Sequence, residues 1–253
     1  VLQTEGPLLI LAGAGSGKTR VIAHRIAHLV SNDVCPPDRI LAVTFTNKAA
    51  EEMRTRVETL LGVDCRKMWI STFHALCARL LRREAPHIGL SRDFVIYDSA
   101  DQLSAIKQAM RQLGVDDTAV QPRLALSRIS HAKNRMEGPE VFTVNSWNPR
   151  DQQIGTLYWM YLKALTDANA LDFDDLLLKT VELFEKSEQV RDKYSQKFRF
   201  LMVDEYQDTN RPQYLLIQRL ASRHRNLCVV GDPDQSIYKW RGADLRNILD
   251  FEH

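Results

Sequence analysis

The stretch that most restricts the fold lies near the start of the sequence, where an apolar run passes through a glycine-rich loop into a helical pattern. It reads LLILAGAGSGKTRV and spans residues 8–21. Gly13, Gly15 and Gly17 allow backbone conformations that other residues avoid, so consecutive N–H groups can point toward one centre at the N-terminus of the next helix. This order of strand, loop and helix is typical of a phosphate-binding loop in an α/β protein.

Five short apolar segments predict a parallel sheet. They lack the alternation of apolar and polar residues seen in half-exposed strands, as expected of strands covered by helices on both faces. Helix-period stretches follow most of them, which indicates an α/β fold with a parallel sheet flanked by helices. The predicted strands are PLLILA (7–12), RILAVTFT (39–46), KMWISTF (67–73), FRFLMVD (198–204) and NLCVVGD (226–232).

The alternation of strands and helices stops in the middle of the sequence, where strand candidates become scarce and helical patterns dominate. We therefore expect an all-helical subdomain of residues 86–169, inserted into an α/β domain formed by residues 1–85 and 170–253. Ser99 with Gln102 three residues later predicts a capping box at the start of its first long helix, and Gly114 predicts the end of that helix.

Composition sets only broad limits. The 253 residues are 44% hydrophobic and 26% charged, with a formal net charge of +2, so the chain is globular material without an overall basic character. The four cysteines form no C-x-x-C pair, which argues against a zinc or redox motif and favours reduced thiols in a cytoplasmic protein. No segment approaches the roughly 20 apolar residues of a membrane span. We expect a soluble, cytoplasmic protein without a membrane partner.

The glycine loop carries the signature A-x-x-x-x-G-K-T over residues 12–19, with alanine in place of the usual first glycine. Lys18 is expected to neutralise phosphate charge, and Thr19 offers a hydroxyl to Mg²⁺. An ordinary glycine-rich turn is the alternative, but strand, loop and helix occur in the required order. The residues predicted to hold the nucleotide phosphates are Gly13, Ala14, Gly15, Ser16, Gly17, Lys18 and Thr19.

Hydrolysis of a triphosphate also requires carboxylates at the end of a neighbouring strand, and FRFLMVDEYQDTN supplies them. Asp204 directly follows the apolar run, where it can bind Mg²⁺, and Glu205 can polarise the attacking water. In isolation, such a pair could also be a surface feature of a strand end.

The segment VVGDPDQSIYKWRGAD begins at the last predicted strand. Gln235 is placed to hydrogen-bond a γ-phosphate or the attacking water. Tyr238 and Trp240 could be core residues, but they lie beside Lys239 and Arg241, and aromatic rings among cations form a stacking platform for unpaired bases.

Six ordered segments together resemble the N-terminal motifs of the UvrD/Rep/PcrA group of superfamily 1 DNA helicases. The resemblance extends over nearly the whole sequence and implies a RecA-like ATPase core with a helical insertion. It further implies 3′-to-5′ movement along single-stranded DNA, driven by ATP with Mg²⁺, in DNA repair or replication. The segments are AGAGSGKT, TFTNKAAEEM, TFHALCARLLR, LDFDDLL, VDEYQDTN and GDPDQSIYKWRGAD.

The resemblance implies the same roles for the nucleotide-site residues described above and adds Arg20, packed on adenine. It implies that Arg241 couples the nucleotide and DNA sites. The residues implied to lie along the DNA channel or to stack on bases are Phe45, Thr46, Thr72, His74, Tyr238 and Trp240.

Two departures from the family pattern concern the ends of the sequence. It begins at Val1, without the family's upstream glutamine that reads adenine, and Gln3 is too close to the phosphate loop to replace it. It ends at His253, before the second RecA-like half, whose arginines contribute roughly 10³–10⁵ in rate in related NTPases. We therefore expect a fragment that binds single-stranded DNA and single/double-strand junctions, needs the C-terminal half as its partner, and by itself hydrolyses ATP barely.

Two other functions remain open from the sequence. The chain could be the motor part of a recombination helicase–nuclease, or a nucleotide-gated DNA-binding module that does not unwind DNA.

Weaker signals lie outside these motifs. In PRLALSRISHAKNR (122–135), Arg128, His131 and Arg135 share a helix face, and a solvated basic face and a phosphate-backbone contact are equally open. His24 and His28, four residues apart, fit a plain helix surface better than a metal site.

The acidic residues of LDFDDLL could suggest a metal cluster, but helix capping and first-turn charge explain Asp172, Asp174 and Asp175 more simply.

Overall fold

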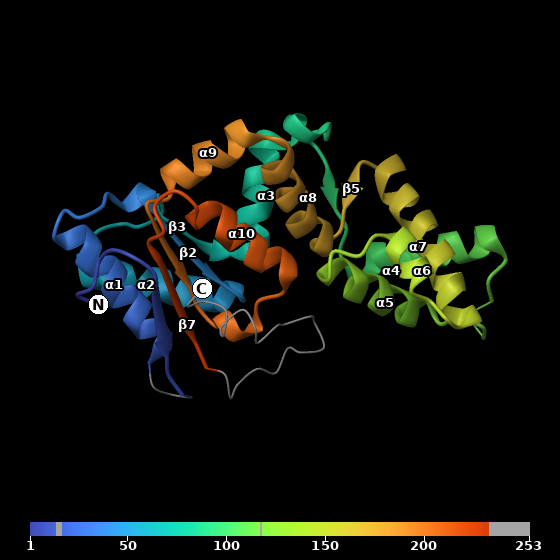
Figure 1. Ribbon diagram of the computed structural model, residues 1–253, viewed down its shortest axis with the longest axis horizontal. Helices are drawn as coiled ribbons and strands as arrows, with labels where there is room; N and C mark the ends of the chain where they lie inside the picture. Colours follow the sequence, from blue (N-terminus) through green and yellow to red (C-terminus); the bar gives the residue numbers. More distant parts are fainter. Residues whose placement is uncertain (14–16, 117, 233–253) are drawn as a thin grey trace.

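The computed structural model describes residues 1–13, 17–116 and 118–232, and within this part of the chain a five-stranded parallel sheet lies at the core of one of two lobes (Figure 1). Its strand order is β1-β7-β6-β2-β3, and every neighbouring pair is parallel. Each strand lies within one of the five segments predicted from the sequence, which confirms the α/β class. The strands are β1 (Leu8–Leu11), β2 (Ile40–Thr44), β3 (Trp69–Thr72), β6 (Phe200–Val203) and β7 (Leu227–Gly231).

Helices cover both faces of this sheet. On β2, Ile40 and Ala42 join one core with α1 and α2, whereas Leu41 and Val43 join the core on the opposite face. Successive strand residues point to opposite faces, so a strand covered on both sides is apolar throughout. The covering helices are α1 (Lys18–Ser31) and α2 (Asn47–Leu61) on one face, and α3 (Phe73–Glu84), α8 (Phe173–Lys186), α9 (Glu188–Lys197) and α10 (Arg211–Ala221) on the other. In the described ranges, short 3₁₀ turns also connect elements; they are η1 (Pro37–Arg39), η2 (Ala85–Ile88) and η3 (Tyr206–Asp208).

The middle of the chain forms a separate group of helices beside the sheet (Figure 1). These helices pack around their own apolar core, in which Ile106, Ile129 and Leu157 are fully buried. The chain enters through β4 (Val95–Ile96) and returns through β5 (Ala170–Leu171), which pair in parallel. The limits 86 and 169 for an inserted subdomain stay predictions. The helices are α4 (Ser99–Leu113), α5 (Pro122–Asn134), α6 (Pro139–Val144) and α7 (Pro149–Asp167).

The predicted capping box of α4 is wrong by one residue. Asp98 is the N-cap, and its side chain accepts hydrogen bonds from the N–H groups of Ala100 and Asp101, while Asp101 accepts from the N–H of Asp98. Gln102 instead donates to the carbonyl of Tyr97. Aspartate is as good an N-cap as serine and here precedes it, so the helix starts one residue earlier than the Ser99 cap implied. Gly114 ends the helix with φ 65°, as predicted.

The four cysteines, Cys35, Cys65, Cys77 and Cys228, are buried and free of disulfides. Burial raises the pKa of the Cys77 thiol to about 12, so this thiol stays protonated and packs as a small apolar side chain. Within the described part of the chain, every helix is too short or too polar to cross a lipid bilayer.

Candidate nucleotide and DNA site

The sequence-predicted nucleotide residues gather at one edge of the sheet. Lys18 begins the helix that follows β1, Asp204 follows β6, and Asp232 follows β7. These three strands are parallel neighbours in the order β1-β7-β6, so their carboxyl ends lie at the same edge. The sheet thus brings together the two parts of the predicted site that are far apart in sequence.

The side chains at this edge touch. The Thr19 hydroxyl donates to Asp204 Oδ2 at 2.7 Å, although 185 positions separate the two residues. Lys18 Nζ lies 3.5 Å from Glu205 Oε2 and 3.8 Å from Asp232 Oδ2. Burial raises the pKa of Asp204, and the neighbouring Glu205 charge acts in the same direction. A buried carboxylate of this kind is stabilised by a bound cation.

The start of α1 suits an anion. Gly17 is its N-cap, with φ 85° and no side chain capping the first turn, and no acidic residue lies in that turn. No side-chain cap shields the N-terminus of this helix, and helix N-termini bind anions through their first N–H groups. Any residue with a Cβ would be strained at Gly17, so glycine is required there.

Arg20 is exposed on the same helix, where its Nε lies 3.4 Å from His24 Nε2. His28 Nδ1 lies 3.1 Å from Asn32 Nδ2. Both histidines thus pair with side chains one turn away on α1, in agreement with a plain helix surface. The contact of Arg20 with adenine stays a prediction.

A cleft of about 480 Å³ runs between the α/β domain and the inserted helices. Phe45, Thr46 and His74, three of the predicted DNA-channel residues, line it. Thr72 does not: it is buried, and its hydroxyl accepts the Ala75 N–H as the N-cap of α3. The structure shows a capping role for Thr72, and its contact with DNA stays a prediction.

Other walls of the cleft were not predicted from the sequence, except that His131 had been considered for a contact with the phosphate backbone. Ser127, Ser130 and His131 of α5 line it, as does Phe173, whose ring meets His74 edge to face at 6.0 Å and is 44% exposed. Phe173 lies inside the LDFDDLL segment that resembles the family, and this was the only signal for it in the sequence. Exposed aromatic rings in a polar cleft are suited to stacking on unpaired bases.

The three aspartates of LDFDDLL lie between this cleft and the core. Asp172 is the N-cap of α8 and forms a capping box with Asp175, which confirms the capping interpretation. The sequence reasoning did not foresee Lys133, whose Nζ donates to Asp172 at 2.7 Å and to Asp175 at 2.8 Å. The Tyr161 hydroxyl also donates to Asp172, at 2.9 Å. These contacts attach α5 and α7 to α8.

Asp174 faces the cleft instead, where Asn134 Nδ2 donates to it at 3.1 Å. Burial and the negative charge of Asp172 raise the pKa of Asp174 to about 6. Asn210, the N-cap of α10, donates its side-chain N–H to Asn134 Oδ1. This pair of amides connects the carboxylate-bearing loop after β6 with the inserted helices.

The basic face of α5 is largely paired. Arg128 binds Asp151 at 2.8 Å, and Arg135 binds Glu137 at 2.8 Å. These pairs favour a solvated face for the two arginines, whereas His131 on the same helix lines the cleft.

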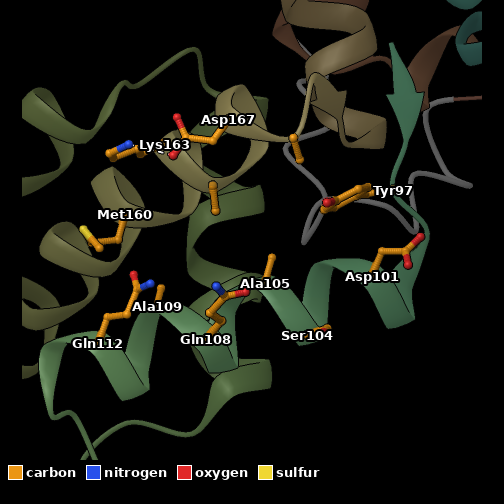
Figure 2. Close-up of a pocket in the computed structure, with 12 residues that line it drawn as sticks. Tyr97, Asp101, Ser104, Ala105, Gln108, Ala109, Gln112, Met160, Lys163 and Asp167 are labelled. Atoms are coloured by element: carbon orange, nitrogen blue, oxygen red, sulfur yellow. Dashed lines mark hydrogen bonds and ion pairs between the residues drawn. The ribbon is translucent and has the colours of Figure 1, made fainter. Parts of the chain in front are cut away.

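A second cavity of about 480 Å³ lies between α4 and α7 and is lined by polar and small side chains (Figure 2). Lys163 and Asp167 on its rim form an ion pair at 2.6 Å. None of the site residues predicted from the sequence is among its lining residues, so it is separate from the nucleotide edge. The described residues contain no group of three or more His, Cys, Asp and Glu side chains arranged to hold a metal by themselves.

Several predicted site residues lie outside the described residues, and their roles stay predictions. They are Ala14, Gly15, Ser16, Gln235, Tyr238, Trp240 and Arg241.

Comparison with known proteins decides the family. The family model of the UvrD/REP helicase N-terminal domain matches residues 1–253. The chain belongs to this helicase family. It is 52% identical over 252 residues to a Bacillus subtilis protein and 50% identical to proteins of Staphylococcus epidermidis and Staphylococcus aureus, each named ATP-dependent DNA helicase PcrA.

These alignments cover 100% of the chain but only 34–35% of each relative. The chain thus spans about one third of the length of the relatives it matches, and it corresponds to their N-terminal domain. The resemblance drawn from the six sequence segments is confirmed.

Proposed function

We propose that the chain is the front part of an ATP-dependent 3′-to-5′ DNA helicase or translocase, which binds ATP with Mg²⁺ at the sheet edge and single-stranded DNA in the adjoining cleft. The observation that carries the proposal is the contact of Thr19 with Asp204, beside Lys18 and Glu205. A loop from the first strand and carboxylates from a distant strand meet at one point, as phosphoryl transfer from a nucleotide requires.

The residues at this point fit a magnesium ion. The Thr19 hydroxyl and the Asp204 carboxylate are oxygen ligands, which Mg²⁺ prefers, and Asp204 is buried at 2% exposure. When bound, the ion would neutralise charge on the transferred phosphoryl group. Lys18 would bind phosphate oxygens, and Glu205 would orient the attacking water and accept its proton.

The cleft supports the DNA part of the proposal. Phe45, His74 and Phe173 offer ring surfaces, and serine and asparagine side chains of α5 offer hydrogen-bonding groups. The cleft and the nucleotide edge share the loop after β6, since Asp208 and Asn210 line the cleft a few residues beyond Asp204. The same proposal includes a preference for single/double-strand junctions and cooperation with a C-terminal half. It also includes a cytoplasmic location.

Binding of a fluorescent ATP analogue, with and without Mg²⁺, tests the nucleotide site directly. We expect Lys18→Ala to weaken binding at least about tenfold, because an unscreened phosphate charge is left in the site. Lys163→Ala, on the far helical subdomain and 67% exposed, is the matched control and should leave binding unchanged. Equal affinities for the two variants would refute the site.

The chain by itself should release phosphate from ATP very slowly. The chain spans about one third of the length of the relatives it matches, and arginines supplied by another domain contribute about 10³–10⁵ in rate in related NTPases. Brisk phosphate release stimulated by single-stranded DNA from the purified chain would contradict this expectation.

A further inference from the structure

Gln207 is a buried side chain that connects Glu205 to the end of β7. Its Nε2 donates to Glu205 Oε2 at 2.7 Å, and its Oε1 accepts the backbone N–H of Asp232 at 2.9 Å. A longer contact places Nε2 3.5 Å from Asp208 Oδ2. Gln207 is 1% exposed, so water cannot take the place of these hydrogen bonds, and losing them would leave buried polar groups unpaired.

The orientation of this amide is determined by its partners. A backbone N–H can only donate, so the carbonyl oxygen of Gln207 has to face Asp232. The NH₂ group then has to face the Glu205 carboxylate, which can only accept when ionised. Turning the amide around would break both hydrogen bonds, so the two ends of the side chain are not interchangeable.

The backbone of the loop supports the same arrangement. Glu205 has φ 48° and ψ 45°, in the left-handed region that residues other than glycine seldom adopt. The turn through η3 returns Gln207 toward Glu205, and the Glu205 N–H donates to Asp204 Oδ1 at 3.0 Å. Strained backbone of this kind concentrates at functional sites.

Among the described residues, the hydrogen bond and the ion pair of the Glu205 carboxylate both fall on Oε2. Gln207 Nε2 lies 2.7 Å from Oε2, and Lys18 Nζ lies 3.5 Å from the same atom. Gln207 donates to Oε2 and the Lys18 ammonium lies near the same oxygen, so both contacts favour one orientation of the carboxylate, in which Oε1 is the oxygen without these two contacts. The side chain of Glu205 is 37% exposed, so the carboxylate lies at an edge of the site that is accessible to solvent.

We propose that Gln207 is a positioning residue, which holds the Glu205 carboxylate so that Oε1 receives the proton of the attacking water. In that step the water oxygen bonds to the γ-phosphorus, its proton passes to Oε1, and the electrons of the breaking P–O bond leave with ADP. This inference takes the role of Glu205 from the proposed function and therefore rests on it. Since Asp232 precedes Gln235 by three residues, Gln207 also ties Glu205 to the segment predicted to sense the γ-phosphate.

A double-mutant cycle on the stability of this chain tests the contact without any activity. Gln207→Glu keeps the length and the acceptor toward Asp232, but it places a second carboxylate against Glu205. We expect it to lower the urea midpoint in the wild-type background and to lower it far less in the Glu205→Gln background, where the new amide donates to the new carboxylate. Equal losses in both backgrounds would overturn the proposal.

Kinetics of the full-length helicase that carries this chain test the positioning role. Gln207→Met has a similar volume and loses both hydrogen bonds. We expect its Kd for ATP to stay within about threefold of the wild-type value, while hydrolysis in a single turnover at saturating ATP slows about 10–100-fold. Ile217→Val, a buried change on α10 that leaves Glu205 untouched, is the control for a general loss of stability.

The outcomes separate this proposal from the proposed function. Unchanged hydrolysis by Gln207→Met, with ATP still bound, would overturn the role of Gln207 and leave the nucleotide site intact. Failure of the unmodified chain to bind ATP would remove the proposed function, and the stability cycle would still decide whether Gln207 holds Glu205.

Discussion

Two clusters in this molecule combine a lysine with carboxylates, but they have different roles. At the α5–α8 contact, Lys133 binds Asp172 at 2.7 Å and Asp175 at 2.8 Å, and all three side chains are at most 8% exposed. At the sheet edge, Lys18 lies at the longer distances of 3.5 and 3.8 Å from Glu205 and Asp232, and Glu205 is 37% exposed.

The distances and exposures of the two clusters separate charges that stabilise the fold from charges that can react. Although burial works against its charge, the carboxylates of Asp175 and Asp172 raise the pKa of Lys133, so this ammonium stays charged and its partners are within the protein. At the sheet edge the charges are spaced more widely, and the Glu205 side chain is partly open to solvent, although Lys18 and Asp232 are buried. Sequence alone shows a lysine and an acidic pair in both cases; spacing and exposure distinguish them.

The largest effect should come from Glu205→Gln at the sheet edge. Removing a general base costs roughly 10²–10⁴ in rate, because the attacking water loses its proton acceptor. We expect ATP hydrolysis by the full-length helicase to fall by that factor while ATP binding persists, measured by phosphate release and by equilibrium binding. Loss of binding together with turnover would place Glu205 among the binding residues instead.

Lys133→Ala should produce the largest loss of stability. It leaves two buried carboxylates without their cation, which costs about 3–5 kcal/mol in comparable buried pairs. Urea denaturation measures the loss, with Lys163→Ala as the exposed control, for which an ion pair at the surface contributes at most about 1 kcal/mol. Similar losses for both lysines would erase the distinction drawn between buried and exposed charge.

Phe173→Ala should weaken binding of single-stranded DNA. Its ring is 44% exposed in the cleft, and stacking of one base on an aromatic side chain contributes about 1–3 kcal/mol. Fluorescence anisotropy with a labelled oligonucleotide should therefore show a loss of about 5-fold to 100-fold. The comparison variant is Trp159→Ala, whose ring is 49% exposed on α7 and is not among the residues lining the cleft. An equal loss for both rings would argue against the cleft as the DNA path.

The smallest effect should be a change in pH dependence from Asp174→Asn. Burial and the Asp172 charge raise the pKa of Asp174 from 3.8 to about 6, so the folded state holds this proton more tightly than the unfolded state. Its contribution to stability is complete below pH 4 and is lost as the pH rises through 6. Lys133 acts against this shift, and Asp175 adds to it.

The asparagine variant keeps an acceptor for Asn134 but cannot ionise. We expect the free energy of unfolding of the variant, relative to wild type, to increase between pH 4 and 7. Urea titrations of both proteins at several pH values measure this difference, in which the other titrating groups cancel. Parallel curves would mean that Asp174 ionises freely in the folded protein.

Features that lie within one strand, one turn or one helix could be predicted from the amino-acid sequence. The five apolar segments became the five strands of the sheet, and Gly17, Lys18 and Thr19 lie where a strand–loop–helix signature puts them. Hydrophobic runs and glycine requirements are local, so a short window of sequence contains the whole physical reason for them. The error at α4 was also local, since Asp98 and Ser99 are both acceptable caps and only the backbone decides between them.

The contacts between residues far apart in sequence became known from the folded structure alone. The order β1-β7-β6 brought Thr19 to Asp204, and the packing of α5 on α8 gave Lys133 its two carboxylates. Likewise, Gln207 reads as one polar residue among several in VDEYQDTN, and its two hydrogen bonds exist only because the turn at Glu205 faces the end of β7. Such contacts depend on how whole helices and strands are arranged. The free energy that favours one arrangement is a sum over the entire core, so no single segment of the sequence contains it.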